Sequence, residues 1–319
     1  MQKDGTLRED MSMKKISGIC LSVVVLLILG GGCCGQQKKI TSRYLQFPST
    51  VAGVVKVMTF NVRVDTFLDG WNRWNNRKQS IFDILAENSA DVIGLQETLD
   101  FQAQQVQQAL PQYALYSVGR NDGKQGGESC AIFYRKDRFV LLDSGTFWFS
   151  DTPLKPGSKD WGNLPPRICS WVYLVEKKAG TRFYAYNLHL DNLSQNSREK
   201  SVELLAKQVA ARKTRDPFIV MGDFNMKLDN PAMKYLQKIG YRTPYPRMVD
   251  AWQSVHPGQS CRGTCHSFRG RISGPKIDHI PISENARALE VKIDRREVNG
   301  RYPSDHFPVI AKILLGSSA

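Results

Sequence analysis

The feature that most constrains this chain is a succession of short apolar segments, rich in β-branched and aromatic residues, that begins at Val54. Amphipathic helical stretches separate some of these segments, while other segments follow one another directly. This order favours a mixed sheet system with helices outside over an all-parallel doubly wound sheet. The predicted strands are 54–61, 91–97, 130–135, 169–176, 183–190, 218–225, 277–282 and 308–315, and the predicted helices are 77–88, 194–213 and 231–240.

The N-terminal segment is predicted to lie outside this fold. Lys14 and Lys15 precede an apolar run from Ile16 to Leu29, and three glycines then precede Cys33 and Cys34. A basic region, an apolar core and small residues are typical of a secretory signal peptide. The run is shorter than the roughly 20 residues of a membrane span, although an uncleaved anchor helix remains the alternative.

Small residues directly before a cysteine also resemble the lipobox of bacterial lipoproteins. We therefore expect residues 1–34 to be a signal peptide with a lipobox, 35–52 to be a polar tether and 53–319 to be the folded domain. The protein is then exported to the periplasm or the cell surface, and a lipid on Cys33 or Cys34 anchors it to the membrane.

Composition and charge limit the classes of partner. The chain has 319 residues, of which 41% are hydrophobic and 23% charged, which is ordinary for a globular protein. A net charge of +14 favours anionic partners such as phosphorylated substrates, nucleic acid or anionic lipid. Lys and Arg form no dense run that would by itself indicate nucleic acid, and we expect the protein to act as a monomer.

The cysteines of the folded part allow two interpretations. Cys261 and Cys265 could close a short loop as a disulfide in an oxidising compartment. A zinc site that includes His266 is the alternative, but a second Cys/His pair at zinc-ligand spacing is missing from the sequence. Cys130 and Cys169 are predicted to be buried strand residues.

Polar residues recur where the apolar segments end. Any one of them is expected to be a turn residue, but charged groups at the ends of buried strands are costly unless they are paired or bind a metal. Carboxylates, amides and imidazoles without a thiol or serine nucleophile indicate a site for Mg²⁺, Mn²⁺ or Ca²⁺. The residues are Asn61, Glu97, His189, Asp223, Asn225, Asp278, Asp305 and His306.

The segments TFNVR, GLQE, NLHLD, GDFN, KIDHI and SDHFP, in this order, resemble the endonuclease/exonuclease/phosphatase superfamily, which is also called DNase I-like. The resemblance extends from about Val54 to Leu314. It implies a four-layer α/β sandwich, in which two packed mixed β-sheets are flanked by helices. It also implies divalent-metal-dependent hydrolysis of phosphate esters.

The same resemblance implies roles for the metal and water side of the site. Glu97 would bind the metal ion, with Asn61 beside it and Asp305 helping to hold the ion. Asp223 would orient or deprotonate the attacking water, and Asn225 would hold a phosphate oxygen.

Further roles follow for the phosphate side. Asp278 would hydrogen-bond His306 and keep it charged against the phosphate, because an opposite charge raises the pKa of histidine. His189 would stabilise the developing charge or serve the leaving oxygen, paired with Glu128 as in some relatives. The predicted substrate contacts are Arg167, Arg77 and Phe268, although Arg77 and the nearby Trp71 and Trp74 could equally be structural.

Two positions depart from the family pattern. Arg63 stands where relatives that act on DNA often carry an acidic residue, which favours a single main metal site. His279 replaces a common aromatic residue. We expect a phosphodiesterase or nuclease first, and a phosphatase of sugar or inositol phosphates or a phospholipid diesterase as alternatives. A catalytically inactive binding protein is least expected, because the Glu, Asp and His positions are all kept.

Overall fold

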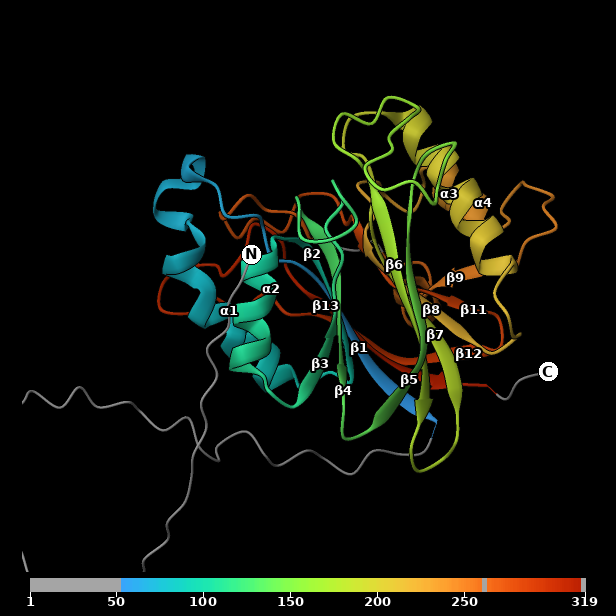
Figure 1. The fold of residues 1–319 in the computed structure, drawn as a ribbon, viewed down its shortest axis with the longest axis horizontal. Coiled ribbons are helices and arrows are strands. Elements are labelled where there is room, and N and C mark those ends of the chain that lie inside the picture. The colour runs from blue at the N-terminus through green and yellow to red at the C-terminus, as the bar shows by residue number, and fades with distance from the viewer. Residues whose placement is uncertain (1–52, 260–262, 317–319) are drawn as a thin grey trace, which may run out of the picture. The chain divides into compact units, whose positions relative to one another are not determined.

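The predicted β-segments pair into two sheets that pack face to face, with helices on both outer sides (Figure 1). The computed structural model describes residues 53–259 and 263–316. The predicted signal peptide, tether and lipid-bearing Cys33 or Cys34 lie outside the described residues, as does Cys261. The membrane anchor and the Cys261–Cys265 disulfide therefore remain predictions.

The first sheet joins the beginning of the described chain to its end. Within it β1 pairs in parallel with β2 and antiparallel with β13, and the other neighbours are antiparallel. In spatial order its strands are β12 (Ala286–Ile293), β13 (Val309–Leu315), β1 (Val54–Asn61), β2 (Val92–Thr98), β4 (Ser129–Arg135) and β3 (Tyr113–Tyr116).

The second sheet repeats this mixed pattern. Here β7 and β8 are parallel and the other pairs are antiparallel. In spatial order its strands are β5 (Phe139–Trp148), β6 (Ile168–Glu176), β7 (Arg182–His189), β8 (Phe218–Asp223), β11 (Pro281–Ser283) and β9 (Met248–Asp250), and β10 (Asp278–His279) also pairs with β8.

Alternation along the strands produces the layers. In β1, Val55 and Val57 belong to the apolar cluster shared by the two sheets, whereas Phe60 belongs to the cluster under the first pair of helices. Side chains two apart point to the same face of a strand, so each sheet buries both faces. The helices that cover them are α1 (Trp74–Asn88) and α2 (Asp100–Ala109) on the first sheet, and α3 (Gln195–Ala210) and α4 (Pro231–Leu236) on the second.

The four-layer α/β sandwich implied by the sequence is thus confirmed. Cys130 and Cys169 are buried in β4 and β6, as predicted. The short helices η1 (Phe67–Asn72) and α5 (Ala251–Val255) complete the described elements.

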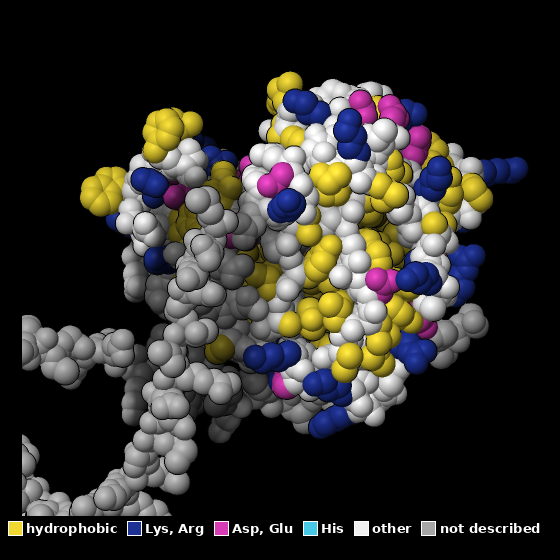
Figure 2. All heavy atoms as spheres, viewed as in Figure 1, with side chains coloured by type: hydrophobic (Ala, Val, Ile, Leu, Met, Phe, Trp, Pro, Cys, Tyr) yellow, Lys and Arg dark blue, Asp and Glu magenta, His cyan; other side chains and the backbone are white. Residues whose placement is uncertain are grey.

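Large apolar side chains reach solvent at η1. Phe67, Leu68 and Trp71 are each more than three-quarters exposed, and Figure 2 shows hydrophobic side chains standing out over this end of the molecule. Among the described residues, none of the helices combines the length and the apolar character that a membrane crossing needs.

Candidate active site

Two parallel strand pairs bring four of the predicted residues to one end of the sandwich. Asn61 is the last residue of β1, and Glu97 is the penultimate residue of β2. His189 ends β7 directly beside Asp223 at the end of β8. Ligand sites of α/β proteins form at the carboxyl ends of such strands. The two sheets therefore each supply half of one site.

His306 lies between two carboxylates. Its Nδ1 is 2.9 Å from Asp278 Oδ2, and its Nε2 is 3.9 Å from Asp223 Oδ2. Burial lowers the pKa of His306, but the charge and hydrogen bond of Asp278 outweigh burial and hold this pKa well above its ordinary value. Asp278 and Asp223 face each other across β10 and β8, where like charges repel, and the imidazolium offsets that repulsion.

Asp223 is a carboxylate at the centre of the site. Its Oδ2 accepts a hydrogen bond from Asn61 Nδ2 at 3.1 Å, and its Oδ1 accepts one from the backbone N–H of Asn225 at 2.9 Å. Burial, and then the charge of Asp278, raise the pKa of Asp223 to about 7. A carboxylate with such a pKa can take up a proton near neutral pH.

Glu97 and Asp305 form a second acidic group beside Asp223. Glu97 Oε1 accepts from Asn61 Nδ2 at 3.0 Å, and Glu97 Oε2 accepts from the backbone N–H of Val64 at 3.1 Å. Burial raises the pKa of Asp305, and the negative charge of Glu97 raises it further. Two mutually repelling carboxylates with free lone pairs fit a hard divalent cation. Asn61 donates to both Glu97 and Asp223, so it orients these two carboxylates.

A different acidic group also has metal-ligand spacing. One ligand atom each from Asp223, Asp278 and His306 lies within 4.8 Å of the others. A histidine whose pKa is raised by Asp278 carries a proton on both ring nitrogens, and a protonated nitrogen offers no lone pair to a metal. Protonation of His306 therefore makes this group a poorer set of cation ligands than two carboxylates such as Glu97 and Asp305.

Unusual backbone conformations cluster at the site. Arg63, Glu97 and Asn225 have φ values of 60°, 60° and 52°. Positive φ is uncommon for residues other than glycine and costs free energy, so it persists where surrounding contacts enforce it. One such contact is the hydrogen bond from the backbone N–H of Arg63 to Asn61 Oδ1, at 3.0 Å.

His189 contacts Asp223 from the other side. Its Nε2 is 3.6 Å from Asp223 Oδ2 and 3.0 Å from Asn225 Nδ2, whose amide also donates to the backbone carbonyl of Leu190. Burial, and then the charges of Arg167 and Arg120, lower the pKa of His189 well below its ordinary value. His189 is thus a neutral imidazole whose Nε2 accepts the amide hydrogen of Asn225.

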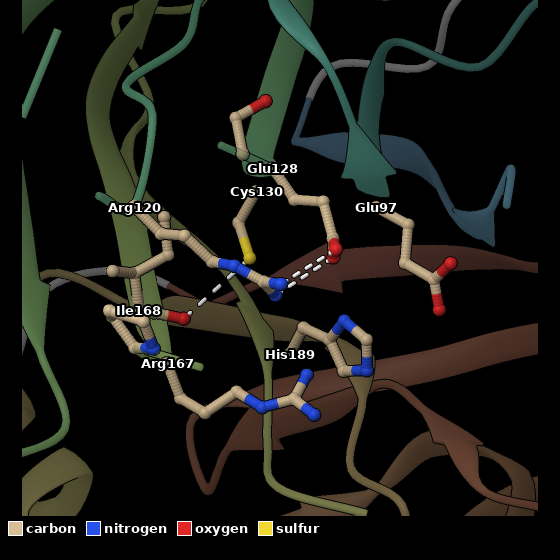
Figure 3. A pocket seen from close by; sticks show the side chains of 9 residues that line it. Glu97, Arg120, Glu128, Cys130, Arg167, Ile168 and His189 are labelled. Atoms are coloured by element: carbon tan, nitrogen blue, oxygen red, sulfur yellow. Dashed lines mark hydrogen bonds and ion pairs between the residues drawn. The ribbon is translucent and has the colours of Figure 1, made fainter. Parts of the chain in front are cut away.

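Glu128 has a partner other than the one expected. Both of its carboxylate oxygens accept hydrogen bonds from the guanidinium of Arg120, at 2.8 and 2.6 Å, whereas the Nε2 of His189 faces Asn225. Figure 3 shows the Arg120–Glu128 pair on one side of a small recess, with Arg167 and His189 on the other. Arg167 is held by Asn192 at 3.0 Å and by Asp191 at 3.4 Å.

Arg77 and Phe268 lie at the margin of the site. The buried guanidinium of Arg77 donates to backbone carbonyls of Asn72, Val62, Arg63 and Pro303. These bonds join the segment after β1 to the segment that carries Asp305, which is a structural role. Phe268 is partly buried, and its ring centre lies 5.7 Å from Arg77 Cζ. Of the two tryptophans, Trp74 is fully buried and Trp71 is exposed.

The comparison with protein families agrees with this geometry. The model of the Endonuclease/Exonuclease/phosphatase family matches residues 58–306. That span contains the motif residues from Asn61 to His306.

The chain belongs to this family. Its members are hydrolases that act on phosphate esters. The chain is 30% identical to a solved mannosyl-6-phosphatase from Bacteroides thetaiotaomicron, with a TM-score of 0.74, over 81% of this chain and 99% of that one. It is 22% identical to mouse nocturnin over 287 residues, which are 80% of this chain and 63% of the length of nocturnin. A D. rerio TDP2 structure complexed with a single-strand DNA product shares the fold at 18% identity and a TM-score of 0.64, over 82% of this chain and 98% of that one.

Two features of the site were not predicted. Arg120 was missed, although it and Glu128 flank a turn-forming stretch, NDGKQGG, and such a turn places its two ends side by side. The second is a buried amide pair between the sheets, in which Gln96 Nε2 donates to Asn187 Oδ1 at 2.7 Å. Both residues adjoin predicted site residues, and only the packing of the two sheets brings them together.

Proposed function

We propose that the protein hydrolyses phosphate ester bonds with a divalent cation held by Glu97 and Asp305, by direct attack of water. The observation that carries this proposal is the position of the Asp223 carboxylate. It lies between a charged His306, a neutral His189 and the amide of Asn61, beside the acidic pair that suits a cation.

Asp223 would orient the attacking water and accept its proton. Its pKa of about 7 matches that task at neutral pH, and the amide of Asn61 fixes which way the carboxylate faces. A serine, cysteine or covalent intermediate is not required for this step.

His306 would donate a hydrogen bond to the phosphate as its negative charge grows. Asn225 and His189 would line the phosphate site, since the amide hydrogens of Asn225 are already directed at His189 Nε2 and the Leu190 carbonyl. The charged His306 donates from Nε2, because Nδ1 is bonded to Asp278. Donors that are already in place when the charge develops stabilise the transition state without reorganising. A divalent cation, when bound, polarises the phosphate and stabilises charge on the leaving oxygen.

Two substrate classes have support. The 30% identity to a mannosyl-6-phosphatase supports a phosphate monoester of a sugar. The fold shared with a TDP2 complexed with a single-strand DNA product, together with the net charge of +14, supports a phosphodiester or nucleic acid, which is the first expectation from the sequence motifs.

Hydrolysis assays on the purified full chain test the proposal. We would compare p-nitrophenyl phosphate, bis-p-nitrophenyl phosphate and a short single-stranded oligonucleotide, each with Mg²⁺, Mn²⁺ or EDTA. We expect cleavage that EDTA abolishes and that Mg²⁺ or Mn²⁺ restores. Cleavage that is indifferent to EDTA, or the same in Asp223→Asn as in the native chain, would contradict the proposal.

A further inference from the structure

We propose that Arg120 is a specificity-determining residue, which together with Arg167 and His189 forms a recess for one terminal oxygen of the substrate phosphate and so selects phosphate monoesters. This inference rests on the proposed function, since it assigns a substrate class to the same site.

The recess adjoins the cation side of the site as well as His189. Its lining includes Glu97, Arg120, Glu128, Arg167 and His189 (Figure 3). A phosphate bound between Glu97 and His189 would therefore turn one of its sides towards the recess. The guanidinium groups of Arg120 and Arg167 come from opposite walls, one before β4 of the first sheet and the other before β6 of the second.

The size of the recess sets an upper limit on what can enter it. It leaves about 10 Å³ for the centre of a water-sized group, which is room for about one water molecule or one phosphate oxygen. A monoester presents three terminal oxygens and nearly two negative charges, whereas a diester presents two terminal oxygens and one charge. When two terminal oxygens face the cation and His306, the third position of the phosphate faces the recess. In a monoester this position is a third oxygen, which fits, and in a diester it is the second ester group, which does not.

Arg120 is held in place for such a contact. Besides the two bonds to Glu128, its backbone N–H donates to the Glu128 carbonyl at 2.9 Å, and its own carbonyl accepts from Trp148 Nε1 at 2.6 Å. A guanidinium has five N–H donors, and Glu128 accepts one hydrogen bond from each of the two terminal nitrogens, Nη1 and Nη2, of Arg120. Donors that remain can reach into the recess at little entropic cost, because the side chain is already fixed.

The experiment compares monoester and diester hydrolysis in Arg120→Gln and in the double variant Arg120→Gln/Glu128→Gln. The double variant replaces an ion pair of zero net charge by two uncharged glutamines. It leaves no unpaired carboxylate, so we expect it to keep the native melting temperature. Loss of a charge-assisted hydrogen bond is expected to lower kcat/KM for p-nitrophenyl phosphate by about 10- to 100-fold. The value for bis-p-nitrophenyl phosphate should change by less than about threefold, by the same reasoning.

Product inhibition provides a second measurement. Inorganic phosphate should inhibit the double variant about tenfold more weakly than the native chain, as one lost charge-assisted bond predicts. Dimethyl phosphate, which mimics a diester, should inhibit both equally. Equal losses on both esters, or unchanged inhibition by phosphate, would overturn the role of Arg120.

Failure of the proposed function would look different. In that case the native chain hydrolyses neither ester with Mg²⁺ or Mn²⁺. Calorimetric titration with inorganic phosphate then tests the recess by itself: tighter binding to the native chain than to the double variant supports it, and equal binding overturns it.

Discussion

His306 and His189 lie 3.9 and 3.6 Å from the same oxygen of Asp223, and both are at least nine-tenths buried. Their surroundings differ in the sign of the nearest charges. Carboxylates surround His306, and Asp278 keeps it protonated. Arg167 and Arg120 stand beside His189, which stays neutral. The same residue type at the same depth therefore provides a cation on one side of the Asp223 carboxylate and a neutral imidazole on the other.

The largest loss of activity is expected from substitutions of the charged His306 and of Asp223. His306→Ala and Asp223→Asn should each lower kcat/KM by about 10³-fold, since the first removes charge stabilisation and the second removes the proton acceptor. Steady-state assays with saturating Mg²⁺ measure this. His256→Gln is the control, because His256 contacts the carbonyl of Val291 outside the site. A loss below tenfold in either variant would contradict the assignment.

A smaller loss of activity is expected from substitution of the neutral His189. His189→Ala should lower kcat/KM by about 10²-fold, since it removes one positioned partner of the phosphate while Asp223 and His306 remain. The same assays apply. An equal loss of kcat/KM in His189→Ala and His306→Ala would contradict the different roles of the two histidines.

The charge of His306 can be tested through pH. Asp278→Asn removes the carboxylate that raises the pKa of His306, so the alkaline limb of the pH–kcat/KM profile should move to lower pH by at least about one unit. Activity at pH 8 should fall by about tenfold as a result. The acid limb, set by Asp223 near pH 7, should move downwards as well, since the charge of Asp278 raises that pKa too. An unchanged alkaline limb would show that His306 does not depend on Asp278.

The smallest effect is on stability, and it has opposite signs for the two histidines. The folded-state pKa of His189 is lowered, so the unfolded chain binds the proton first and stability falls as pH drops below about 6.5. The folded-state pKa of His306 is raised, so its contribution is present below about pH 6.5 and is lost as pH rises through the raised value.

Urea unfolding at pH 7.5 and 5.5 measures this difference. Between these values His189→Gln should lose less stability than the native chain, by about 1 kcal/mol. His306→Gln should lack the stabilisation that the native chain has at the lower pH. Equal pH dependence in all three proteins would contradict the opposite charge states.

Much of the architecture could be read from patterns along the chain. The strand at 54–61 is where it was predicted, and the helix predicted at 77–88 begins at Trp74. The elements α2, β3, β5 and β12 were not predicted. Half of the residues of helix α2 are glutamine, and β5 and β12 lie at sheet edges with several exposed residues, so their apolar periodicity is weak.

One departure from the family pattern gains a structural meaning. His279 is fully buried, and its Nε2 contacts the carbonyl of Met226 at 2.9 Å. Its Nδ1 lies 2.7 Å from Lys276 Nζ and 3.2 Å from Asp250 Oδ2. The residue that replaces a common aromatic therefore belongs to a buried polar cluster, which nothing in the neighbouring sequence indicates.

The sequence by itself determined which residue types end the strands, because each motif is local and a strand carries its last residues to the edge of the sheet. Tertiary structure alone decided the charge state of each group, because the neighbours come from distant parts of the chain. Asp278 is 28 residues from His306, and Asn61 is 162 residues from Asp223, to which it donates a hydrogen bond. Burial and distance set a pKa, and neither is a property of a sequence motif.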